Sequence, residues 1–164
     1  MAGITHRLGI ISDTHGLLRP EAQQALLGCD HIVHAGDIGN ADVLRDLALI
    51  APLTPVRGNN DHGPWAERIP LTWRIAFGGL DFYVLHDLAD LEIDAAAEGI
   101  AVVVSGHSHH PRIEDRDRVL FVNPGSAGPR RFRLPVTVAE IVVDQGRARA
   151  RIVELPIAPK KKSR

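Results

Sequence analysis

The chain has 164 residues, of which 45% are hydrophobic and 24% are charged, and its formal net charge is −1. This composition is typical of one soluble globular domain with a sizeable core, and the near-neutral charge excludes a global electrostatic pull toward nucleic acid or a membrane surface. Cys29 is the single cysteine, which excludes an internal disulfide framework and favours a reducing, cytoplasmic location. We expect no membrane-spanning helix and no secretory leader, because no apolar run reaches about 18 residues.

Residues 1–156 are expected to form a single domain, because no linker or internal repeat divides them. Residues 157–164 end in the basic sequence KKKSR, and they are predicted to be a disordered tail. A weak contact of this tail with an anionic partner is the less favoured interpretation.

The first predicted strand, residues 8–11, is followed by a polar segment that contains Asp13 and His15. A carboxylate and an imidazole two residues apart can share one metal ion. Asp13 as the N-cap of a helix is the alternative, but the next helical pattern, residues 21–27, begins too late for that role. We therefore favour Asp13 as a ligand.

The second predicted strand, residues 31–35, ends at Gly36 and Asp37. The two oxygens of the Asp37 carboxylate make it a natural bridge between two metal ions. Asn40 is predicted to cap the next helix. Two histidines of the strand are not predicted ligands: His34 lies inside it and is expected in the core, and His31 lies at its opposite end.

A third predicted strand, residues 53–57, contains Pro55, which favours an edge position in a sheet. It is followed by an asparagine-rich loop in which the amide oxygen of Asn59 can complete a metal's coordination without adding charge. Residues 72–77 and 80–85 flank a glycine pair and predict a hairpin, whose second arm ends at His86. Residues 91–98 are predicted to form a short helix closed by Gly99.

The unbroken apolar run of residues 100–104 predicts a strand buried on both faces, and it ends at Gly106. His107 and His109 follow, with His110 adjacent. On an extended chain, side chains two residues apart project to the same side, so we expect His107 and His109 to face one site together. After Pro111 two further hairpins are predicted, over residues 112–122 and 136–155, separated by a turn at 123–126.

Five predicted strand ends thus carry imidazole, carboxylate or amide groups, and ligands in α/β sheets bind at the carboxyl ends of strands. Mixed nitrogen and oxygen donors with one bridging carboxylate suit a pair of divalent ions such as Mn²⁺, Fe²⁺, Ni²⁺ or Zn²⁺. The lack of a thiolate argues against a structural zinc site. The seven predicted ligands are Asp13, His15, Asp37, Asn59, His86, His107 and His109.

With these residues in order, the sequence resembles the calcineurin-like metallophosphoesterases. The family pattern D-x-H, G-D, G-N-x-D/E, H and G-H-x-H is matched in order across residues 8–110. Residues 123–126, Asn-Pro-Gly-Ser, resemble the small prokaryotic phosphodiesterase branch, which also includes the retromer subunit Vps29. The resemblance implies an α/β fold of two packed mixed β-sheets, a β-sandwich flanked by helices, with metal ions at the strand carboxyl ends.

The resemblance also implies a role for each matched residue. The first metal would be held by Asp13, His15, Asp37 and His109, and the second by Asp37, Asn59, His86 and His107. Asp37 would bridge the two ions, and Asp61 would orient the Asn59 loop through hydrogen bonds.

Two positions depart from the family pattern. Many members carry a histidine as general acid where this chain has Asn60, which cannot donate a proton but can hydrogen-bond a phosphate oxygen. Close relatives often have H-G-H where this chain has His86-Asp87-Leu88. We hypothesise that His62 or His110 supplies the missing acid, although an exposed loop histidine is the favoured interpretation of both. Arg130 and Arg131 are candidates for phosphate contact, with surface arginines as the favoured interpretation.

We therefore expect a metal-dependent phosphodiesterase that uses two divalent ions, Mn²⁺ first and Ni²⁺, Fe²⁺ or Zn²⁺ as alternatives, with a bridging hydroxide as nucleophile. The expected substrate is a small phosphodiester. The alternative is a non-catalytic scaffold of the Vps29 type, which would not need all seven ligands. A protein phosphatase is disfavoured by the short chain and by Asn60. A homodimer through the C-terminal hairpins would cover their edges.

Overall fold

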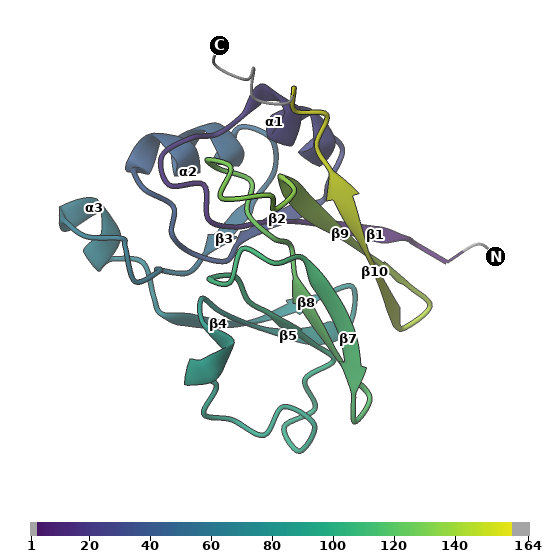
Figure 1. Ribbon diagram of the computed structural model, residues 1–164. Helices are drawn as coiled ribbons and strands as arrows, with labels where there is room; N and C mark the ends of the chain where they lie inside the picture. The colour runs from purple at the N-terminus through teal and green to yellow at the C-terminus, as the bar shows by residue number, and fades with distance from the viewer. Residues whose placement is uncertain (1–2, 159–164) are drawn as a thin grey trace, which may run out of the picture.

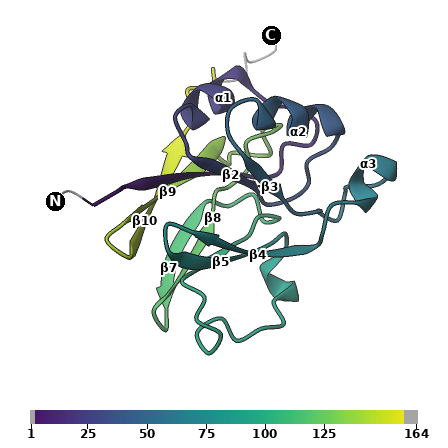
Figure 2. The ribbon, with the colours of Figure 1, turned by 180° about the vertical axis from the view of Figure 1, so that it is seen from behind.

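The computed structural model describes residues 3–158, so most of the predicted basic tail lies outside the described residues. Two five-stranded mixed sheets pack face to face, and α1 (Pro20–Leu26) and α2 (Ala41–Ala48) cover the outer face of the first (Figure 1). Figure 2 shows the same layers from behind. The predicted fold of two packed mixed sheets flanked by helices is confirmed. No helix within residues 3–158 is long and apolar enough to cross a membrane.

The first sheet has the strand order β10-β9-β1-β2-β3. Strands β1, β2 and β3 run parallel, so their carboxyl ends share one edge, while β9 is antiparallel to both β1 and β10. Strand β3 lies at the sheet edge, as Pro55 predicts, because proline cannot donate to a further neighbour. The strands of this sheet are β1 (His6–Ile11), β2 (His31–His34), β3 (Leu53–Pro55), β9 (Thr137–Asp144) and β10 (Arg147–Glu154).

The second sheet has the order β4-β5-β6-β8-β7. Its three central strands are parallel. Each outer strand is antiparallel to its neighbour and forms a hairpin with it, β4 with β5 and β7 with β8. The hairpin around the glycine pair is confirmed as β4–β5, and the two C-terminal hairpins are confirmed as β7–β8 and β9–β10. The strands are β4 (Thr72–Phe77), β5 (Leu80–Leu85), β6 (Val102–Val104), β7 (Arg112–Arg116) and β8 (Val119–Asn123).

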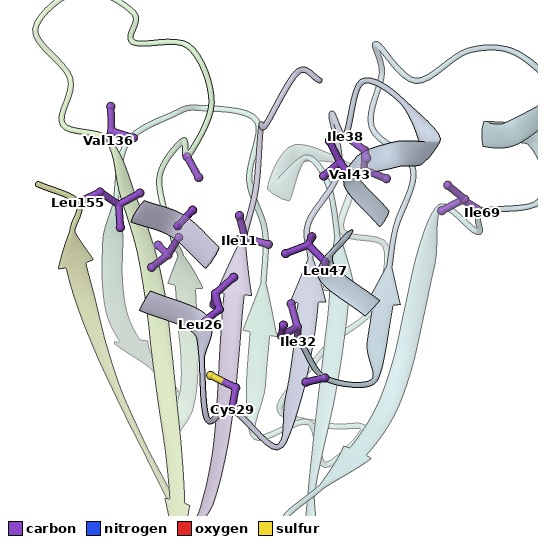
Figure 3. Packing of buried hydrophobic residues seen from close by; sticks show 14 residues of the cluster. Ile11, Leu26, Cys29, Ile32, Ile38, Val43, Leu47, Ile69, Val136 and Leu155 are labelled. Atoms are coloured by element: carbon purple, nitrogen blue, oxygen red, sulfur yellow. The ribbon is translucent and has the colours of Figure 1, made fainter. Parts of the chain in front are cut away.

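Alternation along the strands divides the core into layers. On β1, Leu8 and Ile10 face the second sheet, where they meet Phe82 and Val104, whereas Ile11 faces the helices. Figure 3 shows the helix layer, in which residues of α1 and α2 pack over β1 and β2. Its labelled members include Ile11, Leu26, Ile32 and Leu47. The two layers hold the carboxyl ends of β1 and β2 in fixed positions.

The predicted helix over residues 91–98 is wrong. A 3-10 turn, η1 (Leu88–Asp90), precedes the segment, and the segment itself forms a turn in which the Asp94 side chain accepts from the Ala97 N–H at 3.1 Å and the Asp94 carbonyl accepts from the Glu98 N–H at 3.0 Å. Leu91, Ile93 and Ala95 instead pack as an irregular layer on the outer face of the second sheet. Contact with this sheet outweighs the helix propensity of the segment. A short helix that the sequence did not predict, α3 (Pro64–Glu67), follows the asparagine-rich loop.

Candidate metal centre

The loops that follow β1, β2, β5 and β6 meet at one edge of the sandwich, where the backbone joins them directly. The Asp13 N–H donates to the Gly36 carbonyl at 3.0 Å, and the His15 N–H donates to the Asp37 carbonyl at 2.9 Å. The two sheets are joined by the His107 N–H, which donates to Oδ2 of Asp13 at 3.1 Å. Polar residues that stand far apart in the sequence are thereby brought to a single site.

A first group of side chains consists of Asp13, His15 and His109, whose ligand atoms lie within 4.8 Å of one another. Oδ1 of Asp13 lies 3.3 Å from Nε2 of His109 and 3.8 Å from Nε2 of His15. Oδ1 of Asp13, Nε2 of His15 and Nδ1 of His109 are buried and have no hydrogen-bond partner among the described residues. Unpartnered buried polar atoms are costly, and a cation bound between Oδ1 of Asp13 and Nε2 of His15 would satisfy these two atoms.

A second group consists of Asp37, His86 and His107, again with ligand atoms within 4.8 Å of one another. Nδ1 of His86 donates to the Ala35 carbonyl at 2.7 Å, which turns Nε2 toward Oδ2 of Asp37 at 3.4 Å and Nδ1 of His107 at 3.3 Å. The amide oxygen of Asn59 lies 3.2 Å from the same His107 nitrogen. This group has the mixed nitrogen and oxygen donors that divalent transition metals prefer.

Asp37 lies between the two groups. Its Oδ2 is 3.7 Å from Nε2 of His15 in the first group and 3.4 Å from Nε2 of His86 in the second. The predicted ligand sets therefore converge on one carboxylate, in the arrangement that a bridge between two ions needs. The residues present fit a pair of divalent ions, although their role as ligands stays a prediction.

The backbone at this site is not extended, so His107 and His109 do not project side by side; they reach the one site from its two sides, which is the division that the resemblance implies. His107 belongs to the second group and His109 to the first. Both have left-handed backbone angles, with φ of 71° and 63°. Asp13, His15 and Asp37 have φ of 56°, 46° and 55°. Such angles are uncommon outside glycine, and their gathering here marks a strained site held by its surroundings.

Two glycines allow the loops to approach the carboxylates. A Cβ on Gly58 would lie 2.1 Å from the Asp37 nitrogen and 2.2 Å from Oδ1 of Asp37. A Cβ on Gly106 would lie 2.1 Å from Oγ of Ser12 and 2.8 Å from Oδ2 of Asp13. Any other residue at these positions would push the loops away from the carboxylates.

The electrostatic surroundings keep both carboxylates ionised. Burial alone would raise the pKa of Asp37, but hydrogen bonds from His86 and Asn60 outweigh it and hold this pKa well below its usual range. The pKa of Asp13 is lowered in the same way, because the effects of His109 and Ser12 outweigh burial. Burial would lower the pKa of His86, but Asp37 raises it above the ordinary value. Because Asp37 favours the protonated imidazole, a metal ion at the second group competes with a proton for His86.

Surrounding hydrogen bonds fix the loops that carry these groups. Asp61 accepts from the backbone N–H groups of Gly58, Ile38 and Gly39 at 2.8, 3.2 and 3.0 Å, and so ties the Asn59 loop to the Asp37 loop. Asn60 donates to Asp37 through its backbone N–H at 3.0 Å and its side chain at 2.9 Å. Asn60 thus orients the central carboxylate.

The expectation of a packed, hydrogen-bonded His34 in the core is confirmed, and its partners link two loops of the site. The Gly36 N–H donates to Nδ1 of His34 at 3.1 Å, so Nε2 carries the proton and donates to Oγ1 of Thr14 at 3.0 Å. That hydroxyl donates to the Ile38 carbonyl at 2.7 Å. The chain links the Asp13 loop to the Asp37 loop and requires a neutral imidazole.

Two cavities, of about 330 and 630 Å³, open beside the second group. Asp87 and His107 line both cavities, and Asn59 and His86 line the larger one. The exposed His110 lines the smaller cavity. His62 is exposed on the loop before α3 and is not among the residues of either group. The acid role of both histidines stays a prediction.

Residues 7–146 match the family described as "Calcineurin-like phosphoesterase superfamily domain". A probable metallophosphoesterase of Methanothermobacter thermautotrophicus is 32% identical over 157 residues, which cover 89% of this chain and 91% of that protein.

Two solved structures are similar in fold. One belongs to a novel archaeal phosphodiesterase, with a TM-score of 0.72, 24% identity, and coverage of 90% of this chain and 99% of that one. The other is Entamoeba histolytica Vps29 complexed with Zn²⁺, with a TM-score of 0.67, 17% identity, and coverage of 90% and 98%. The family match over residues 7–146, together with the 32% identical Methanothermobacter protein, shows that this chain belongs to the calcineurin-like phosphoesterase superfamily.

Proposed function

We propose that this protein is a metal-dependent phosphodiesterase with two divalent ions. The observation that carries the proposal is the convergence of two groups of candidate ligands on Asp37, with ligand atoms of each group within 4.8 Å of one another. When bound, two such ions supply an activated water as nucleophile and neutralise the phosphoryl oxygens as charge develops. Mn²⁺ is the first candidate, and Ni²⁺, Fe²⁺ or Zn²⁺ are alternatives.

The residues of the chain hold and orient the ions. Asp13, His15 and His109 would hold the first, Asn59, His86 and His107 would hold the second, and Asp37 would be shared by both. Asn60 and Asp61 keep the Asp37 and Asn59 loops in register through their hydrogen bonds. Preorganised ligands are what make the site effective, because no reorganisation is then needed during the reaction.

The two cavities support a diester as the substrate class. Asp87 and His107 line both of them, and each has room for one small substituent of a phosphate held at the second group. A monoester would use only one of them. The leaving alcohol needs a proton unless it is phenolic, and Asn60 cannot supply one. We therefore expect high activity toward aryl diesters and lower activity toward alkyl diesters.

The alternative is a non-catalytic scaffold like Vps29. The Zn²⁺ complex of Entamoeba Vps29 indicates that a protein of this fold can carry metal, so metal binding alone does not discriminate the two functions. Turnover does. The seven predicted ligands, held within two convergent groups and the adjacent Asn59, support the enzyme.

The test is a rate assay on chelator-stripped protein with bis-p-nitrophenyl phosphate and p-nitrophenyl phosphate. Each substrate is given with Mn²⁺, Ni²⁺, Zn²⁺ or Mg²⁺ and without metal. We expect metal-dependent release from the diester that exceeds release from the monoester, and a loss of more than about 100-fold in Asp37→Asn.

The control variant is Asp115→Asn, an exposed carboxylate on β7, which should behave as the wild type. A folded protein that binds metal but releases nothing with any ion would contradict the enzyme and favour the scaffold. The next experiment would then be a pull-down of protein partners.

A further inference from the structure

The connection between β8 and β9 forms a closed loop, residues 127–135, here called the arginine loop. Its two ends are joined, because Ser126 and Val136 form a β-bridge and the Thr137 N–H donates to the Ser126 carbonyl at 3.0 Å. The sequence of the loop, AGPRRFRLP, contains three arginines and one phenylalanine and no acidic residue. It is the basic stretch that the ligand pattern left without a role.

The base of the arginine loop is fixed against the first ligand group. The Ala127 N–H donates to the Ser12 carbonyl at 3.0 Å, and the Ser126 hydroxyl donates to the Asp13 carbonyl at 3.1 Å. The backbone at Gly128 lies so close that an added Cβ would be 2.4 Å from the Thr14 carbonyl oxygen. The loop therefore starts directly beside Asp13.

The arginines of the loop are free to bind an anion. Among the ion pairs of residues 3–158, none includes Arg130, Arg131 or Arg133. Nε of Arg130 is buried without a hydrogen-bond partner in the described part of the chain. By contrast, Arg112 and Arg116 beside the smaller cavity are both paired with Glu114. Unpaired guanidinium groups are suited to bidentate phosphate contacts.

Phe132 at the tip of the arginine loop contributes little to the folded state. Its side chain is 94% exposed, and its backbone φ of 54° is unfavourable for a bulky residue. An exposed aromatic ring flanked by arginines provides a flat apolar face next to positive charge. This is the combination with which proteins bind single-stranded nucleic acids, by base stacking and phosphate pairing.

The arginine loop extends from the side of the site that holds the first group, because its base is bonded to the Ser12 and Asp13 carbonyls. The two cavities adjoin the second group, whereas the arginine loop adjoins the first. A substrate that extends past the first group would meet the loop.

We propose that the arginine loop binds a nucleotide portion of the substrate, with a nucleobase stacked on Phe132 and a phosphate beyond the scissile one paired with Arg131 and Arg133. The inference rests on the proposed phosphodiesterase function and names its substrate class as a short single-stranded oligonucleotide. The net charge of −1 does not reveal such a site, because the cations are local and are balanced elsewhere in the chain.

The test separates binding from catalysis. Metal-free protein is titrated into a fluorescein-labelled tetrathymidylate, and fluorescence anisotropy gives the dissociation constant at several salt concentrations. Phe132→Ala should weaken binding by roughly 5- to 50-fold. Phe132→Tyr should restore it, whereas Phe132→Leu should not. Arg131→Ala and Arg133→Ala should each reduce, by about 0.7, the steepness with which the logarithm of the binding constant falls with the logarithm of the salt concentration.

Two matched controls should bind as the wild type does. Leu49→Ala removes another exposed apolar side chain, 82% exposed at the end of α2, and Arg149→Ala removes an exposed arginine of β10. Circular dichroism and thermal unfolding establish that each variant is folded. All of these sites lie on the surface, so we expect folded variants.

Three outcomes would overturn the inference. Wild-type protein that does not bind the oligonucleotide is the first. Equal losses in the loop variants and the controls are the second. Binding of the loop to phosphatidylglycerol vesicles in place of the oligonucleotide, lost in the same variants, is the third and would assign a membrane contact. The phosphodiesterase proposal fails separately if the wild-type protein binds the oligonucleotide but hydrolyses no diester with any metal.

Discussion

Oδ2 of Asp87 lies 3.5 Å from Nε2 of His107, while the other ring nitrogen of His107 faces Asn59 and His86. Oδ1 of Asp87 is held by the Ala89 N–H at 3.0 Å, which fixes the direction of the carboxylate. A carboxylate behind a ligating histidine holds the proton on the distal nitrogen and leaves the near one free for metal. The position that departs from H-G-H thus carries a residue able to orient a predicted ligand.

Replacing Asp87 by asparagine should weaken binding of the second ion by about 10- to 100-fold, because an amide holds the His107 tautomer less firmly. Isothermal titration of the metal-free protein with Mn²⁺ measures the two sites. Asp90→Asn, in the same 3-10 turn and also lining the larger cavity, is the matched control. Equal metal binding in Asp87→Asn and Asp90→Asn would show that Asp87 has no such role.

Substituting Asn60 by histidine should raise the rate toward alkyl diesters by about 100-fold relative to aryl diesters, since an imidazole can protonate an alkoxide leaving group. The backbone N–H of residue 60 would keep its contact with Asp37. Parallel assays on bis-p-nitrophenyl phosphate and a dinucleoside phosphate give the ratio. An equal change in the aryl and alkyl rates would contradict the assignment of position 60 as the place of the general acid.

His62→Ala tests whether the exposed histidine is the acid instead. If His62 protonates the leaving group, the alkyl rate should fall by at least about 100-fold and the aryl rate should stay nearly constant. The same two-substrate assay measures both rates, and His6→Ala, on β1, is the control. Equal effects on both substrates would remove the acid role from His62.

Gly58→Ala should disrupt the second ligand group, because the added Cβ would lie 2.1 Å from the Asp37 nitrogen. Something must move, so we expect a loss of about 1–3 kcal/mol in the free energy of unfolding together with weaker metal binding. Urea unfolding and metal titration measure the two effects. Gly3→Ala, whose Cβ would meet nothing closer than 3.4 Å, is the control. Wild-type stability and metal binding in Gly58→Ala would contradict the close approach of residue 58 to the Asp37 backbone.

His34 should make the metal-free protein less stable in mild acid. Burial lowers the pKa of this imidazole to about 4, from an ordinary value of 6.5. Between these pH values the unfolded chain binds a proton that the folded chain does not, so stability is full above pH 6.5 and falls as the pH drops. The expected loss at pH 5 is about 2 kcal/mol.

Urea midpoints of wild type and His34→Gln, measured at pH 7.5 and pH 5, test this pH dependence. The glutamine variant should lose less stability on acidification than the wild type, whatever its stability at neutral pH. His62→Gln is the control, since its side chain is exposed to solvent. The same acid dependence in wild type and His34→Gln would contradict the role of His34.

The sequence by itself determined the strands, the hairpins and the order of the polar groups. Apolar runs such as residues 100–104 can only be buried, and glycine pairs such as Gly78-Gly79 favour a hairpin turn. Because parallel strands end at one edge, Asp13 and Asp37 had to gather at the edge of the first sheet, and His86 and His107 at the edge of the second. These are local consequences of hydrophobicity and turn geometry.

Only the tertiary structure decided the backbone geometry by which the groups divide. His107 and His109 separate because their backbone is left-handed, a conformation that neighbouring loops impose and that no spacing rule reports. Residues 91–98 are not helical, because packing on the second sheet outweighs local propensity. The contact of Asp87 with His107 and the fixing of the arginine loop beside Asp13 likewise arise from long-range contacts between segments, which a single sequence does not encode locally.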